Sequence, residues 1–186
     1  MVKVKETYGV GTNDIPSECG SVAHGKWFKM LQRCYSPKQQ ELQPMYIGCS
    51  VCDDWLTYSK FKEWFAKQPH TVGVQIDKDI IVIGNKLYSP ETCCLVTQRL
   101  NLLMTTKPKG KLLVGVRKDW FKFHGQIRVD GKHVHLGSFA TEVEAHEAYK
   151  KAKVVQIKRW LPYVTYDMRI VEGLNAHIER LENGHD

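Results

Sequence analysis

Two short segments on either side of Asp130-Gly131 constrain the fold of this chain more than any other feature. Polar and apolar side chains alternate through residues 122–129, and the alternation returns in residues 132–137. A period of two is typical of strands with one buried face, and Asp-Gly is a strong signal for a tight hairpin turn. We therefore predict an antiparallel hairpin, with residues 115–118 as a third strand.

The alternation sorts the side chains of this sheet onto two faces. Phe123, Ile127 and Val129 share the apolar face, where Gly125 leaves room for a neighbouring element. The opposite face carries no acidic residue, although exposed sheet faces normally mix both signs of charge. We call it the basic face, and its members are Arg117, Lys122, His124, Gln126, Arg128, His133 and His135.

A helix is predicted to cover the apolar face. Thr141 and Glu144 have the spacing of a capping box, which marks a helix N-terminus. Alanines and Tyr149 follow at helical spacing, so the helix can pack closely on the strand that contains Gly125. The basic face then remains in solvent. A ribbon of this kind fits the major groove of DNA, where Arg pairs with guanine and Gln with adenine.

The charge of the chain agrees with a polyanionic partner. The formal net charge is +7 over 186 residues, and Lys and Arg that meet phosphates release condensed counterions. No apolar run has the length of a membrane span, and the first residues lack the apolar stretch of a secretory signal. We therefore expect a cytoplasmic protein without a membrane partner.

The six cysteines allow two interpretations. Cys49 and Cys52 form a C-x-x-C pair, and Cys93 and Cys94 are adjacent, so four thiolates are present for a structural zinc ion. The second C-x-x-C of a usual zinc site is absent, and buried free thiols are the favoured interpretation.

The module resembles the Apetala-type (ethylene-response-factor) DNA-binding domain. The matching residues are Gly115-Val116-Arg117, Trp120, Gln126-Ile127-Arg128, Gly131-Lys132, Leu136-Gly137-Ser138-Phe139, Thr141, Glu144-Ala145 and Ala148-Tyr149. The resemblance implies a three-stranded sheet in the major groove, with base or backbone contacts from Arg117, Trp120, Gln126, Arg128 and His135. Gln126 and His135 differ from the residues frequent in that family, so its sequence preference does not transfer. We add Lys118 as a further DNA-binding candidate.

The first hundred residues are predicted to fold around aromatic side chains. Trp27, Met30, Leu31 and Cys34 recur at helical spacing and indicate a core helix. A strand is predicted from Val74 to Asp79, running on into the apolar residues 80–83, with a turn at 84–86. Ser89 as N-cap and Pro90 as first helical residue predict a helix through Thr97 to Asn101.

This order of strand, turn, strand and helix resembles the HNH endonucleases of phages and mobile introns. The resemblance implies a ββα-metal domain in which Asp77 and Asn101 hold one divalent ion, Mg²⁺ or Mn²⁺. The catalytic candidates are then Asp77, Lys78 and Asn101. Lys78 stands at the position of the general-base histidine, and Thr92 replaces the asparagine that usually begins the helix motif. A protonated lysine is a poor base, although it can clamp a phosphate.

Two functions follow from these resemblances. We expect a metal-dependent endonuclease that nicks or cuts duplex DNA, in the host cytoplasm if the chain is phage-encoded. The alternative is a catalytically degenerate DNA-binding regulator, or a takeover factor that inhibits a host protein. The combination of an HNH-like segment with an Apetala-type reader favours the nuclease by analogy only.

The chain ends in a predicted helix with one apolar stripe. Ile170, Leu174 and Ile178 lie on that stripe, and Asn183-Gly184 supplies a stop signal. The stripe either docks on its own chain or pairs with a second copy as a homodimer, and docking in cis is the commoner outcome. The predicted fold is therefore α+β, with an HNH-like domain at 1–104, a linker at 105–112, an Apetala-type domain at 113–158 and a C-terminal helix at 159–186.

Overall fold

The computed structural model describes residues 6–69, 73–105 and 110–184. The chain divides into two compact units, Met1–Thr97 and Gln98–Asp186. The predicted mixture of helices and small sheets is confirmed in both. Residues 106–109 of the predicted linker lie outside the described residues, and the division falls before that segment. Within the described ranges, no helix has the length and apolar character of a membrane span.

Short helices and two-stranded pairings build the first unit. Its strands pair as β1 with β2, β3 with β5 in parallel, and β4 with β6 antiparallel. The elements are β1 (Glu6–Thr7), β2 (Gly11–Thr12), α1 (Val22–Tyr35), α2 (Pro37–Leu42), β3 (Ser50–Val51), α3 (Tyr58–Ala66), β4 (Val74–Asp77), β5 (Leu87–Tyr88) and β6 (Cys94–Thr97), with 3₁₀ turns at Pro16–Glu18, Pro44–Tyr46 and Asp53–Leu56.

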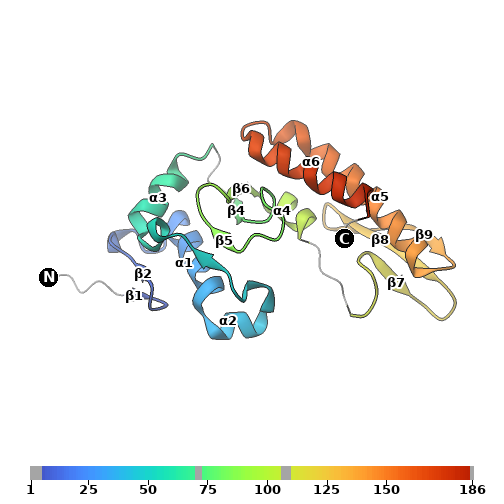
Figure 1. Ribbon diagram of the computed structural model, residues 1–186, viewed down its shortest axis with the longest axis horizontal. Helices are drawn as coiled ribbons and strands as arrows, with labels where there is room; N and C mark the ends of the chain where they lie inside the picture. Colours follow the sequence, from blue (N-terminus) through green and yellow to red (C-terminus); the bar gives the residue numbers. More distant parts are fainter. Residues whose placement is uncertain (1–5, 70–72, 106–109, 185–186) are drawn as a thin grey trace. The chain divides into compact units, whose positions relative to one another are not determined.

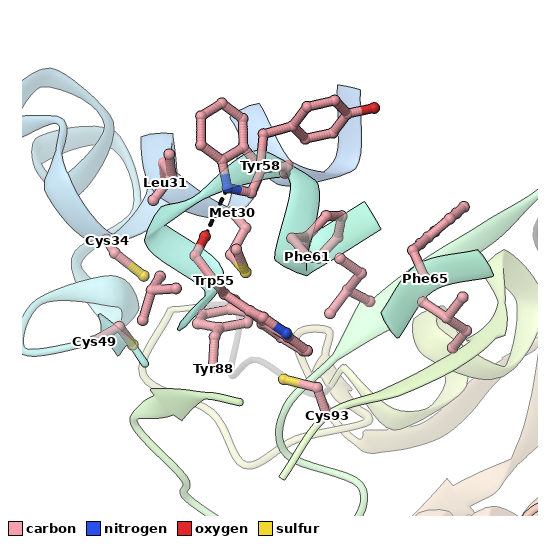
Figure 2. Packing of buried hydrophobic residues seen from close by; sticks show 14 of the residues in the cluster. Met30, Leu31, Cys34, Cys49, Trp55, Tyr58, Phe61, Phe65, Tyr88 and Cys93 are labelled. Atoms are coloured by element: carbon pink, nitrogen blue, oxygen red, sulfur yellow. Dashed lines mark hydrogen bonds between the residues drawn. The ribbon is translucent and has the colours of Figure 1, made fainter. Parts of the chain in front are cut away.

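Helix α1 supplies the centre of this unit's core. The predicted stripe of Trp27, Met30, Leu31 and Cys34 is buried, and Ser21 caps the helix by accepting the N–H of His24. Figure 2 shows these side chains packed with those of α3 and of the loops around β3, β5 and β6. The Trp27 indole donates to the carbonyl of Trp55 at 2.7 Å, which satisfies the polar group inside the core.

The segment after β4 differs from its sequence-based prediction. The strand ends at Asp77, because the Asp77 carboxylate accepts the backbone N–H groups of Asp79 and Ile80 and turns the chain. The predicted helix from Pro90 is also wrong. Ser89 caps a single turn by accepting the N–H of Thr92, and residues 94–97 then form β6, paired with β4. Helix α4 (Gln98–Met104) begins only afterwards.

The second unit contains a three-stranded sheet with a long helix packed against it. Its strands are β7 (Val116–Lys118), β8 (Phe123–Val129) and β9 (Lys132–Phe139), antiparallel in the order β7-β8-β9. The predicted hairpin turn is present, with Asp130 and Gly131 both at positive φ. Helix α5 (Glu142–Trp160) contacts all three strands and lies along the sheet in Figure 1.

Close approach of helix to sheet depends on small residues, as predicted. Thr141 and Glu144 form the expected capping box at the start of α5. A Cβ added to Gly125 would lie 2.9 Å from the carbonyl oxygen of Ala145, so no larger residue fits there without movement of the backbone. Ala145 and Ile127 are buried in this contact.

The C-terminal helix α6 (Met168–Glu182) packs on α5 within the same unit. Its apolar residues Ile170, Leu174 and Ile178 are buried, so the stripe that prompted the homodimer hypothesis is covered in cis. Helix α4 is tied to α5 by Lys153, whose ammonium donates to the carbonyl of Leu103. Burial lowers the pKa of Lys153 to about 8.

Candidate nucleic-acid interface

The strand register brings the basic face together. Residues that pair directly across an antiparallel sheet point to the same side. Arg117 pairs with His124, Gln126 with His135, and Arg128 with His133. Arg117, Arg128, His133 and His135 are exposed, whereas His124 and Gln126 are half-buried. Helix α5 covers the opposite face of the sheet, and among residues 98–105 and 110–184 no other helix or strand contacts the basic face extensively.

A β-bulge keeps the two histidines of β9 on this face. The register shifts between Gly125, which pairs with Gly137, and Gln126, which pairs with His135. Leu136 is therefore unpaired, and strands bulge in this way by giving two residues to one partner. Ser138, which pairs with His124, joins the face on the other side of the bulge.

Lys118, selected from the sequence as a further DNA-binding candidate, lies outside the basic face. It pairs with Phe123, whose side chain lies on the face toward α5. The Lys118 ammonium lies 4.9 Å from the centroid of the Phe123 ring, which is a cation–π distance. The alternation of the strand places Arg117 and Lys118 on opposite sides, so only Arg117 points with His124.

The turn between β7 and β8 presents two exposed aromatic rings. Trp120 is 93 % exposed and Phe121 is 92 % exposed. Asp119 fixes the turn, because its carboxylate accepts the N–H groups of Phe121 and Lys122 at 2.9 Å each. The other oxygen of Asp119 lies 2.6 Å from Nε2 of His124. These contacts fix the backbone of the turn beside His124 of the basic face, and both rings project from it into solvent.

His124 connects this turn to the sheet. Its Nδ1 lies 2.9 Å from the hydroxyl of Ser138, while its Nε2 faces Asp119. Arg128 donates from Nη2 to His133 at 3.2 Å, so that imidazole nitrogen is an acceptor. These contacts order the face before any ligand arrives, which reduces the entropy that binding must overcome.

The hydrogen bonds to the Asp119 carboxylate predict that the stability of this turn decreases in acid. Hydrogen bonds from the N–H of Phe121, from His124 and from the N–H of Lys122 hold its pKa well below the usual range. A carboxylate whose pKa is lower in the folded than in the unfolded protein stabilises the fold at pH values above its unfolded pKa of about 4. This stabilisation is lost as the pH falls toward the folded pKa. We expect Asp119→Asn to lower the thermal midpoint at pH 7 and to have a smaller effect at pH 3.

Asp130→Asn is the matched control for that experiment, because it removes the same charge from the neighbouring hairpin turn and asparagine tolerates the left-handed conformation. A difference between the wild type and Asp119→Asn that stays constant from pH 7 to pH 3 would contradict the assigned role of the carboxylate.

The nuclease candidates Asp77 and Lys78 both form hydrogen bonds within the loop that follows β4 in the first unit. Asp77 is 9 % exposed, and its Oδ1 accepts two backbone N–H groups at 2.8 Å each. Burial raises the pKa of this carboxyl. The buried ammonium of Lys78 lies 2.7 Å from Oδ1 of Asp79 and also donates to the carbonyl of Asn85. Both side chains fasten the loop after β4.

The two side chains predicted to hold a divalent cation belong to different units. Asn101 lies on α4 in the second unit and Asp77 in the first, so neither unit alone contains both predicted ligands. Among the residues in 6–69, 73–105 and 110–184, no group of three or more His, Cys, Asp or Glu side chains is placed to hold a metal ion.

The cysteines named for zinc lie in the core of the first unit. Cys49 and Cys93 belong to the buried cluster, Cys52 packs against it, and Cys94 is buried in β6. Burial raises the pKa of the Cys49, Cys52 and Cys93 thiols, that of Cys93 to about 12. In these surroundings the thiols pack as small apolar groups.

No family model, curated protein or solved structure matches the chain. The case for a function therefore depends on the geometry of the residues themselves.

Three further residues belong to this surface, and the strand alternation in the sequence does not mark them. Asp119 and Phe121 lie in the turn between β7 and β8, where no alternation marks them, although Asp is a common turn residue because its carboxylate can accept backbone N–H groups two and three residues further along the chain. Ser138 was missed because the bulge at Leu136 interrupts the alternation.

Proposed function

We propose that the protein binds duplex DNA through the basic face of the β7–β9 sheet. The observation that carries this proposal is the register, which gathers Arg117, Gln126 and Arg128 on the side of the sheet away from α5. Arg and Gln are the side chains that read guanine and adenine in the major groove, and a small sheet fits that groove. The net charge of +7 favours the same partner.

A binding measurement with the wild-type chain tests the proposal. We would titrate a fluorescent 30-base-pair duplex with protein in chelator and follow anisotropy from 50 to 300 mM salt. If Arg117, Lys122 and Arg128 each meet one phosphate, log affinity should fall against log salt with a slope of about −3. Absence of binding at 50 mM salt, or an affinity independent of salt, would overturn the proposal.

The same preparation tests the sequence-based prediction of cleavage. Supercoiled plasmid is incubated with protein in magnesium or in chelator and then examined for nicked circles. Asp77→Asn is the matched variant, since an amide oxygen can still accept the N–H groups of Asp79 and Ile80 but carries no charge for a cation. Magnesium-dependent nicks that this variant lacks would extend the proposal to an endonuclease, whereas binding without nicks leaves a DNA-binding regulator.

The aromatic turn is proposed to add contacts at the edge of the groove. Apolar side chains beside basic residues often press against sugars or between base steps. We expect Trp120→Ala and Phe121→Ala each to weaken DNA binding about fivefold, which corresponds to about 1 kcal/mol. Their thermal midpoints should stay unchanged, because both rings are over 90 % exposed.

Tyr163→Ala is the matched control for these variants, because it removes another exposed ring from the second unit, 74 % accessible and outside the sheet. Equal loss of affinity in all three variants would show that the turn has no particular role.

A further inference from the structure

Cys19, His24 and Asn13 form a cluster in the first unit that the proposed function does not use. Nε2 of His24 lies 3.9 Å from Sγ of Cys19. The amide nitrogen of Asn13 lies 3.3 Å from that sulfur and 3.3 Å from the same imidazole nitrogen. A thiol, a base and an amide that orients them is the constellation of an activated cysteine nucleophile.

The orientation of the amide is fixed by its other end. Oδ1 of Asn13 accepts the backbone N–H of Ile15 at 3.1 Å, so the NH₂ group must point toward sulfur and imidazole. An N–H aimed at sulfur stabilises the thiolate, which is the reactive form of cysteine. When the thiol ionises, Nε2 of His24 is near enough to receive the proton.

Aromatic rings hold the imidazole in place. The His24 ring lies edge-on to Tyr58, with centroids 5.2 Å apart, and close to Trp27 and Phe28. These ring contacts fix the position of the imidazole beside the thiol. The neighbouring carboxylate of Glu18 is paired with Lys62 and accepts a hydrogen bond from the Tyr58 hydroxyl at 3.0 Å. These contacts reduce the repulsion between its negative charge and a thiolate at Cys19.

Exposure separates Cys19 from the other thiols. All six cysteines lie in the described ranges, and Cys19 is the one among them that is exposed. The remaining five are buried or half-buried. A reagent in solution therefore meets Cys19 first.

We infer that Cys19 is a reactive thiol that forms a mixed disulfide with low-molecular-weight disulfides, with His24 as its proton acceptor. The Cys19 thiol gives its proton to His24, and the thiolate attacks one sulfur of the small disulfide. A new S–S bond forms as the reagent's own S–S bond breaks. Cys19 is thereby oxidised, and the departing thiolate is reduced and takes the proton from the imidazolium.

The test uses the full chain and glutathione disulfide as the probe. The protein is exposed at pH 6.5, quenched with acid and mapped by mass spectrometry, and the rate at Cys19 is compared between native protein and protein unfolded in urea. We expect one adduct per chain at Cys19, formed about tenfold faster in the native state. An ordinary exposed thiol would react no faster when folded, and that result would overturn the inference.

Two variants assign the effect. Cys19→Ser should abolish the fast adduct. His24→Gln should slow it at pH 6.5 and approach the wild-type rate at pH 9, where thiols ionise without a base. The same pH profile in His24→Gln and wild type, or a fast adduct at another cysteine, would contradict the assignment. If His24→Gln does not fold, the comparison of native and unfolded wild type still decides the question.

Discussion

Replacing Arg117 and Arg128 together by alanine should lower the affinity for duplex DNA about a hundredfold, which corresponds to about 3 kcal/mol. Arg117 lies at the outer strand β7 and Arg128 on the central strand β8, so each can meet a base edge or a phosphate of its own. If both meet phosphates, the slope of log affinity against log salt should become shallower by about 2. Anisotropy titrations at several salt concentrations measure both quantities.

The control for this double variant must remove charge without touching the basic face. Arg159→Ala combined with Lys151→Ala serves, because both residues are exposed on α5, the helix that covers the other face of the sheet. This control has the same net charge as the double variant. A similar loss of affinity from both proteins would mean that overall charge, and not the basic face, attracts the DNA.

Gly115→Ala should destabilise the second unit by about 3 kcal/mol, from left-handed backbone strain and overpacking together. Gly115 has φ of +77°, and a Cβ there would lie 2.2 Å from two ring carbons of Tyr149. Tyr149 is buried and cannot move away without disturbing the contact of α5 with the sheet. Hydrogen exchange of peptides from β7, β8 and α5 would report the loss of protection.

Gly131→Ala separates the two causes. Gly131 has φ of +81°, but an added Cβ would meet nothing within 4 Å. It should therefore cost only the backbone strain, about 1 kcal/mol. If both substitutions cost the same, contact with the Tyr149 ring is not what excludes a side chain at position 115.

Local patterns in the sequence predicted most of the second unit and the core helix of the first. The capping box, the Asp130-Gly131 turn and the stripe of Trp27, Met30, Leu31 and Cys34 act through neighbours in the chain, so spacing alone reveals them. The hairpin of β8 and β9 follows from the same kind of pattern.

The segment between Asp77 and Asn101 was predicted poorly, for two physical reasons. The Asp77 side chain competes for backbone N–H groups and ends a strand whose apolar residues would otherwise continue it. Residues 94–97 form a strand because β4 lies beside them, although the Ser-Pro start before them is typical of a helix. Local periodicity reveals neither a side chain that competes for backbone N–H groups nor a partner strand that is distant in the sequence.

Because Leu136 is the unpaired residue of the bulge, it is the one position in β9 where a residue can be deleted without changing the pairing of the strands. A chain without Leu136 would retain every cross-strand pair now present, including Gln126 with His135 and Arg128 with His133. Loss of Val134 would instead turn His133 toward α5, because a shift by one residue exchanges the faces of a strand. We expect the hairpin to keep its basic face after a one-residue deletion only when the deleted residue is the unpaired Leu136. The local twist that the bulge adds would then be reduced.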